Sequence, residues 1–305
     1  MCLNSNSFYV TEDAMNNPFS ETTTLEIPDE ELVSKAQNGD RQSFEELIQR
    51  HQAWIFNIAV RMVGRRADAE DVTQEVLLKV LTRLSTFQGK SLFRTWLYRI
   101  VVNHVLNLKQ RPGEIAFSEL GQQIDQLPDQ NLLDPSETSL PASILIEEAK
   151  VSCTMAMLLC LDRRQRLVYI LGEVFKVNSE IGAELMDLSP ANFRQLLTRA
   201  RHDLYNYMNN KCGLINQANP CRCARKTRSF IELGMVDPKR RQFTREYLGQ
   251  VSAIAPERTK AFHDLLEEQY AGIYREHPFL SPVDQSSALR KLIDQPAFKQ
   301  IFTLG

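Results

Sequence analysis

Apolar residues recur at helical spacing along most of this 305-residue chain, and no alternating strand pattern persists anywhere. Val72, Val76, Val80 and Leu84 follow one another at intervals of four residues, which places them on one face of a helix. A break at residues 38–40 (Asn-Gly-Asp) separates two other amphipathic stretches. The sequence therefore predicts an all-α fold.

Shifts in composition divide the chain into five segments. Proline and glycine gather between residues 112 and 141, where periodic apolar residues are few. The predicted segments are a flexible tail at 1–27, a helical domain at 28–111, an acidic linker at 112–141, a second helical domain at 142–210, and a cysteine-containing extension at 211–305 that ends in a small helical module.

No run of about 18 apolar residues occurs, so no membrane-spanning helix is expected. The first residues also lack the basic and apolar regions of a secretory signal. We expect a cytoplasmic protein that does not contact a membrane.

The net charge of −2 conceals two basic islands. Residues 85–113 and 188–202 contain no acid, whereas residues 114–149 contain no lysine or arginine. Two basic islands joined by an acidic tether favour nucleic-acid binding. The alternative is chance clustering of charge on solvated helix faces.

The first island interleaves aromatic rings with cations. Rings stack on unpaired bases and cations hold the phosphates, so this composition is typical of a platform for single-stranded nucleic acid. The alternative for Trp96 and its neighbours is packing in the core. The residues are Phe87, Phe93, Trp96 and Tyr98, with Lys90, Arg94, Arg99, Lys109 and Arg111.

The second island has the layout of a helix-turn-helix. Asn178 or Ser179 would cap a short helix, and Ser189 would cap a second helix with Pro190 at its first position. The second helix would enter the major groove, with its first residues at base edges and later arginines at phosphates. An ordinary helical corner with a basic face is the alternative. Its exposed face would carry Asn192, Arg194, Gln195, Thr198, Arg199, Arg201 and His202.

The stretch DAEDVTQEVLLKVLTRLSTFQGKSLFRTWLYRIVVNHVLN, residues 68–107, resembles region 2 of the extracytoplasmic-function sigma factors in the sigma-70 family. The stretch NSEIGAELMDLSPANFRQLLTRARHDLYNYM, residues 178–208, resembles region 4 of the same family. No segment between them resembles region 3, which favours the compact class. The resemblance implies a transcription initiation factor that binds core RNA polymerase and promoter DNA, needs no cofactor and has no catalytic centre.

The resemblance also implies roles for individual residues. Asp71, Gln74 and Glu75 would dock on the largest polymerase subunit. The candidates for capturing and opening the −10 element are Lys90, Phe93, Arg94, Trp96, Arg99 and Asn103. The candidates for reading the −35 element are Asn192, Arg194, Gln195, Thr198, Arg199 and Arg201.

In this family the tether threads polymerase channels that otherwise hold nucleic acid, and a carboxylate-rich linker would suit such a basic channel. A disordered acidic spacer is the alternative. An anti-sigma factor stays open as a further partner.

The extension begins with a cysteine cluster. Thiolates with an imidazole bind zinc well, and a Cys-x-Cys pair also suits softer ions such as copper(I), so we expect a metal site with His202 as a fourth ligand. A redox switch and ordinary cytoplasmic thiols are the alternatives. The predicted ligands are Cys212, Cys221 and Cys223, and the expected core thiols are Cys153 and Cys160.

Two further alternatives concern the rest of the extension. Its basic beginning, from Arg222 to Arg245, would either extend the DNA footprint or fold back on the acidic linker. Its helical module at 256–305 would either restrain the two sigma domains or bind a regulator.

Three other functions compete with a sigma factor. A helix-turn-helix regulator acting without polymerase would not need the docking motif at Asp71–Glu75. An enzyme is disfavoured because the chain has no Gly-rich phosphate loop, nucleophile motif or convincing general-base pair. A protein-binding module is disfavoured by the basic islands.

Overall fold

The computed structural model describes residues 27–109, 113–131, 138–243, 272–275, 277, 279–285 and 289. Every regular element in these ranges is helical, which confirms the all-α prediction. The predicted tail, except Ile27, lies outside the described residues. None of the described helices is long and apolar enough to cross a membrane.

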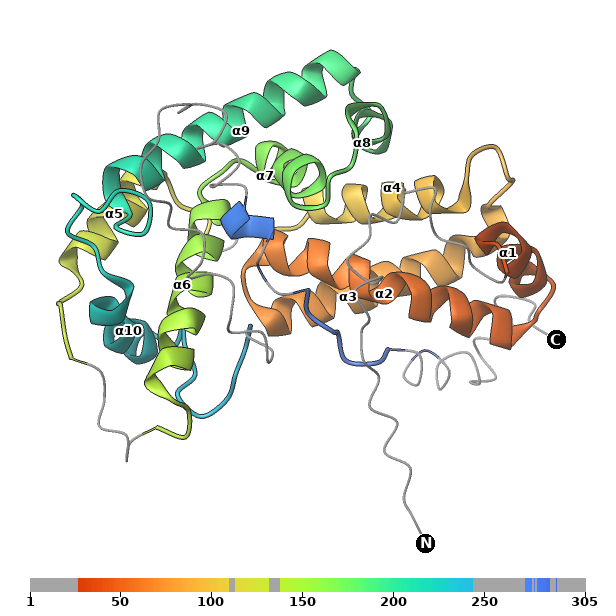
Figure 1. Cartoon of the computed structure of the whole chain (residues 1–305). Coiled ribbons are helices and arrows are strands. Elements are labelled where there is room, and N and C mark those ends of the chain that lie inside the picture. The colour runs from red at the N-terminus through yellow and green to blue at the C-terminus, as the bar shows by residue number, and fades with distance from the viewer. Residues whose placement is uncertain are drawn as a thin grey trace, which may run out of the picture.

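The first helical unit is built around one long helix. Asp40 caps α2 by accepting a hydrogen bond from the backbone N–H of Gln42 (3.2 Å), and Gly64 ends it in the left-handed conformation. α2 packs against α1 and α3, and α4 closes the unit (Figure 1). Its elements are α1 (Asp29–Gln37), α2 (Arg41–Val63), α3 (Arg66–Arg83), the 3-10 turn η2 (Leu84–Thr86) and α4 (Phe93–Leu106).

The second unit contains the predicted helix pair. Asn178 and Ser189 each accept a hydrogen bond from the backbone N–H three residues ahead, at 2.8 and 3.2 Å. A Cβ atom at Gly182 would lie 2.5 Å from the Phe193 ring, so only glycine allows this close packing of α8 on α9. Its elements are α6 (Ala142–Leu159), α7 (Arg163–Tyr169), the π-helical turn η4 (Ile170–Val174), α8 (Ser179–Met186) and α9 (Pro190–Lys211).

The acidic linker contains a helix that the sequence analysis did not predict. In α5 (Phe117–Gln126), Leu120 and Ile124 are buried at i, i+4 spacing, and the Phe117 ring packs at a tilt against Tyr207 of α9 at a centroid distance of 5.1 Å. Apolar burial against the second unit therefore orders a segment in which proline and acids pointed to a spacer.

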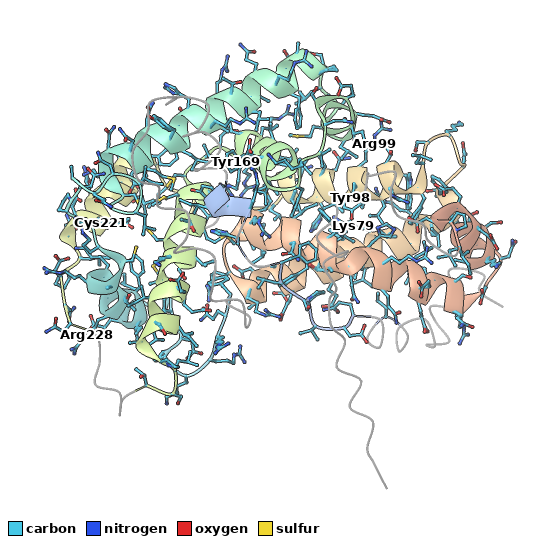
Figure 2. All side chains as sticks on the ribbon, viewed as in Figure 1. Lys79, Tyr98, Arg99, Tyr169, Cys221 and Arg228 are labelled. Atoms are coloured by element: carbon cyan, nitrogen blue, oxygen red, sulfur yellow. The ribbon has the colours of Figure 1, made fainter. Side chains whose placement is uncertain are left out.

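The basic beginning of the extension folds back on this linker in the described residues. It forms α10 (Cys223–Glu232), which packs on α6. Lys226 pairs with Asp129 at 3.1 Å, and the backbone carbonyl of Arg225 accepts a hydrogen bond from Gln130 N–H at 2.9 Å. Figure 2 shows Arg228 on this helix. Of the two alternatives for this segment, the structure contains the fold-back.

One buried cation lies where the two units and the linker meet. The Arg166 side chain is 1% exposed and pairs with Glu114 at 2.9 Å. Its guanidinium also donates to the carbonyl of Met62 in α2, at 2.6 Å. Three further acceptors lie at or just after the end of α6, namely the carbonyls of Leu158, Leu159 and Leu161.

Replacement of this cation should destabilise the whole chain. Arg166→Ala removes the donor to four carbonyls and leaves Arg163 as the remaining arginine on Glu114, so we expect it to lower the free energy of unfolding by about 3–5 kcal/mol. Urea unfolding followed by circular dichroism measures the change. Arg164→Ala, an exposed arginine on the same helix, should change it by about 0.5 kcal/mol or less. Equal effects from the two variants would contradict this role for Arg166.

Candidate nucleic-acid interface

A pocket of about 690 Å³ opens between α3 and α4 of the first unit. It joins the ring of Trp96 to several cations and to the amides of two asparagines, the combination that holds unpaired bases and phosphates. Its lining residues are Glu75, Lys79, Arg83, Trp96, Arg99, Ile100, Asn103, His104, Asn107, Leu108 and Lys109.

A short polar chain sets the charge on the pocket wall. Lys79 Nζ lies 2.5 Å from His104 Nδ1, and His104 Nε2 lies 3.3 Å from a Glu75 carboxylate oxygen. Burial, and then the Lys79 charge, lower the pKa of His104, against the opposing effect of Glu75. His104 is therefore neutral at neutral pH, and its ring nitrogen accepts a hydrogen bond from the Lys79 ammonium.

The structure brings together three of the six residues predicted to contact the −10 element. Trp96, Arg99 and Asn103 all line the pocket. Lys90 is exposed on the loop before α4 and is not among the lining residues. Arg99 also reaches the second unit, because its guanidinium donates to a carboxylate oxygen of Glu184 at 3.2 Å (Figure 2).

The prediction that Phe93 contacts DNA is wrong for this structure. Its side chain is 0% exposed, and its ring packs against the rings of His51, Phe87 and Trp96 at centroid distances of 5.7–5.8 Å. A ring enclosed in this way cannot stack on a base. Its role is to anchor the first turn of α4 in the core.

Arg94 serves a buried ion-pair network instead of facing the pocket. It lies 3.3 Å from Asp29, whose side chain is 1% exposed and also contacts Arg50 and His51 at 3.1 and 2.9 Å. Burial alone would raise the pKa of Asp29, but His51, Arg50 and Arg94 together lower it from 3.8 to about 2. This carboxylate ties α1 to α2 and α4.

The candidate recognition helix α9 presents most of its predicted residues to solvent. Asn192, Arg194, Gln195, Thr198 and Arg199 are all exposed. The Arg194 guanidinium donates to the Ser179 hydroxyl at 3.0 Å, a surface contact that DNA would replace at small cost.

Arg201 is the exception on α9. Its guanidinium is half-buried and binds the carboxylate of Glu173 in η4. The same carboxylate also pairs with Lys176 and Arg275, so a phosphate contact of Arg201 stays a prediction.

The predicted docking residues share one face of α3. Asp71 and Glu75 are exposed and Gln74 is half-buried, at the i, i+3, i+4 spacing that places side chains side by side. Glu75 also lines the pocket, so the docking face and the pocket are contiguous.

The predicted metal ligands are only partly brought together. Cys212 is buried at the end of α9, and its backbone carbonyl accepts hydrogen bonds from the N–H groups of Ile215 and Asn216 at 3.3 and 3.0 Å. The His202 side chain is 71% exposed, beside Asp203, and does not join the thiols. No group of three or more His, Cys, Asp or Glu residues is arranged to hold a metal in the described parts of the chain. A metal site at Cys212, Cys221 and Cys223 therefore stays a prediction.

Sequence reasoning set Cys153 apart from this cluster, but the fold places it nearby. Burial is the main cause that raises its pKa, and the next causes are the neighbouring thiols Cys223, Cys212 and Cys221. Burial likewise raises the pKa of Cys223 to about 12. These sulfurs are therefore protonated thiols at neutral pH, with low nucleophilicity in this state. Figure 2 shows Cys221 beside α5 and α10.

Comparison with known proteins gives three findings. The family model for sigma-70 region 2 matches residues 47–112. The ECF RNA polymerase sigma-E factor of Haemophilus influenzae is 30% identical over 186 residues, covering 59% of this chain and 95% of that protein; its Escherichia coli K12 counterpart is 29% identical over 184 residues, covering 59% and 94%. The solved structure of CnrH in complex with the cytosolic domain of CnrY is 21% identical with a TM-score of 0.42, and the match covers 59% of this chain and 97% of that one.

The Asp29 network predicts a specific pH dependence of stability. Because the pKa of Asp29 is depressed in the folded state, its contribution is fully present above about pH 5 and is lost as the pH falls toward 2. Asp29→Asn should lower the free energy of unfolding by about 2 kcal/mol at pH 7. Urea unfolding between pH 7 and pH 3 should show that the difference in the free energy of unfolding between wild type and Asp29→Asn becomes smaller as the pH falls.

A matched control is Glu31→Gln, which alters an exposed pair on the same helix and should change stability by about 0.5 kcal/mol or less. A gap between wild type and Asp29→Asn that stays constant with pH would show that the carboxylate charge is not the stabilising feature.

Proposed function

Because this chain belongs to the extracytoplasmic-function sigma factors of the sigma-70 family, we propose that it binds core RNA polymerase and directs it to promoters through two separate helical surfaces. The first unit would dock on polymerase and open the −10 element, and the second would read the −35 element. This role places the protein in the cytoplasm.

The pocket between α3 and α4 is the observation that carries the proposal. Arg99 and Asn103 follow the half-buried Trp96 along α4 in the pocket lining, and the remaining cations of the lining supply positive charge. Stacking on an exposed base is worth about 1–3 kcal/mol, enough to offset the unstacking of a base from the duplex. The pocket thus suits the strand of the −10 element that is separated during initiation.

The contiguity of this pocket with Asp71 and Gln74 supports the docking role of α3. A chain held on polymerase through this face would present its pocket to DNA at the same time. A regulator that acts without polymerase has no use for such a face, which is why we place that alternative second.

The exposed first turns of α9 support base reading in the major groove. Asn192, Arg194 and Gln195 carry the amide and guanidinium groups that form paired hydrogen bonds with adenine or guanine. Arg199, one turn later, is placed for phosphate.

Paired substitutions on the two surfaces test this division of labour. Asp71→Ala/Gln74→Ala should weaken binding to core polymerase about tenfold or more, because it removes two side chains from the centre of the docking face. Asn192→Ala/Gln195→Ala should leave polymerase binding unchanged and reduce promoter-dependent initiation about tenfold or more. Fluorescence anisotropy with core polymerase and single-round transcription at fixed salt measure the two effects.

Each pair has a control on its own helix. Thr82→Ala, near the end of α3, and Asn206→Ala, about four turns into α9, are exposed substitutions that should behave as wild type. If the wild-type chain binds DNA tightly by itself and never joins core polymerase, the proposal fails and the polymerase-independent regulator replaces it.

A further inference from the structure

A short segment of the extension lies between the two helical units. We call it the strap, meaning residues 272–275, 277 and 279–285. Figure 1 shows it in blue, at the centre of the molecule beside α6 and α7 and then along α2.

On the first unit, α2 holds the strap by its backbone. The Asn57 side-chain amide donates to the Leu280 carbonyl at 2.7 Å and accepts from the Leu280 N–H at 3.0 Å. Arg66 adds a bond to the Ser281 carbonyl at 2.9 Å. The Phe279 ring packs edge-on against Trp54 at 5.4 Å.

On the second unit, the strap is held by buried side chains. Tyr274 is 0% exposed and packs edge-on against Tyr169 at 5.3 Å, at the end of α7. Arg275 forms an ion pair with Glu173 and donates to its carbonyl at 3.1 Å. His277 Nε2 lies 2.6 Å from the Thr154 hydroxyl of α6.

The strap therefore fastens α2 to α6, α7 and η4. Beside it, α8 packs directly on α4, and Arg99 of the pocket is bound to Glu184. The unit that would read the −35 element thus lies against the unit that would open the −10 element.

This arrangement cannot occupy both promoter elements. By their positions the elements lie roughly 25 base pairs apart, on the order of 80 Å along B-form DNA. Helix α9 begins next to α8 and, with 22 residues, is only about 33 Å long. No residue of α9 is therefore far enough from α4 to read its element while the −10 candidate residues hold theirs.

We propose that the strap is an intramolecular clamp that holds this sigma factor closed, so that its release is required for promoter recognition. The proposal rests on the function proposed above. The fraction of open molecules scales the apparent activity, so a chain open about one time in ten to one time in a hundred gains about 10- to 100-fold when the clamp is removed.

The experiment weakens the strap in the full-length chain without substituting any candidate DNA-contacting residue. Tyr274→Ala/Arg275→Ala removes the buried ring and the ion pair, and Val283→Ala changes an exposed strap residue (56% exposed) as the matched control. Hydrogen exchange is measured on the free chain, and initiation is measured with core polymerase at subsaturating sigma concentration.

The double variant should exchange faster in α4 and α8, beyond the strap and η4, and should initiate about tenfold more than wild type. The control should match wild type in both measurements. Faster exchange confined to the strap and η4, or unchanged initiation, would overturn the clamp.

Two further outcomes are separable. If the double variant loses its helical circular dichroism signal, Arg275→Gln, which keeps the buried Tyr274 ring, replaces it. The clamp then stands only if Arg275→Gln increases both hydrogen exchange in α4 and α8 and promoter-dependent initiation. If wild type never binds core polymerase, the proposed function fails. If wild type binds polymerase and the strap variants initiate no better than it does, the clamp alone fails.

Discussion

The buried guanidinium of Arg166 is the interaction on which the relative placement of the helices depends. Carbonyls at helix ends lack intrahelical donors, and one planar cation satisfies those that end α6 together with that of Met62 at the end of α2. Glu114 neutralises its charge from the linker. Because a buried unpaired charge costs several kcal/mol, the ends of these segments stay together around Arg166.

The side-chain contact between α4 and α8 is much more exposed than the buried Arg166 centre. The Arg99–Glu184 pair is about half exposed on both sides, so it adds little stability. Separation of α8 from α4 would break that pair. A shift of α2 would break the hydrogen bond from Arg166 to the Met62 carbonyl. The ion pair between Arg166 and Glu114 would stay intact, because Glu114 moves with the linker. The strap, the packing of α8 on α4, the contact of Phe175 with Trp54 (4.7 Å) and the shared Met62 carbonyl hold the closed state together.

Much of this fold follows from local signals in the sequence. The caps at Asn178 and Ser189 and the break before Asp40 each act within a few residues, so their helix boundaries were predictable. The positions of the Phe93, Arg94 and Arg201 side chains could not be predicted in this way. Their side chains turn inward because of partners distant in sequence, such as Asp29 for Arg94 and Glu173 for Arg201. The spacing of residues in the sequence shows which side chains share a helix face, but not which partner contacts that face.

The charge pattern of the linker acquires a second meaning in this structure. In the closed chain, Asp129 pairs with Lys226 and Asp125 with Lys211, so the basic start of the extension occupies the acidic linker. If the linker enters a basic polymerase channel, as the family resemblance implies, the same carboxylates must exchange one set of cations for another. Linker insertion and release of α10 would then be coupled, because Asp129 cannot lie in the channel and stay beside Lys226 of α10 at the same time.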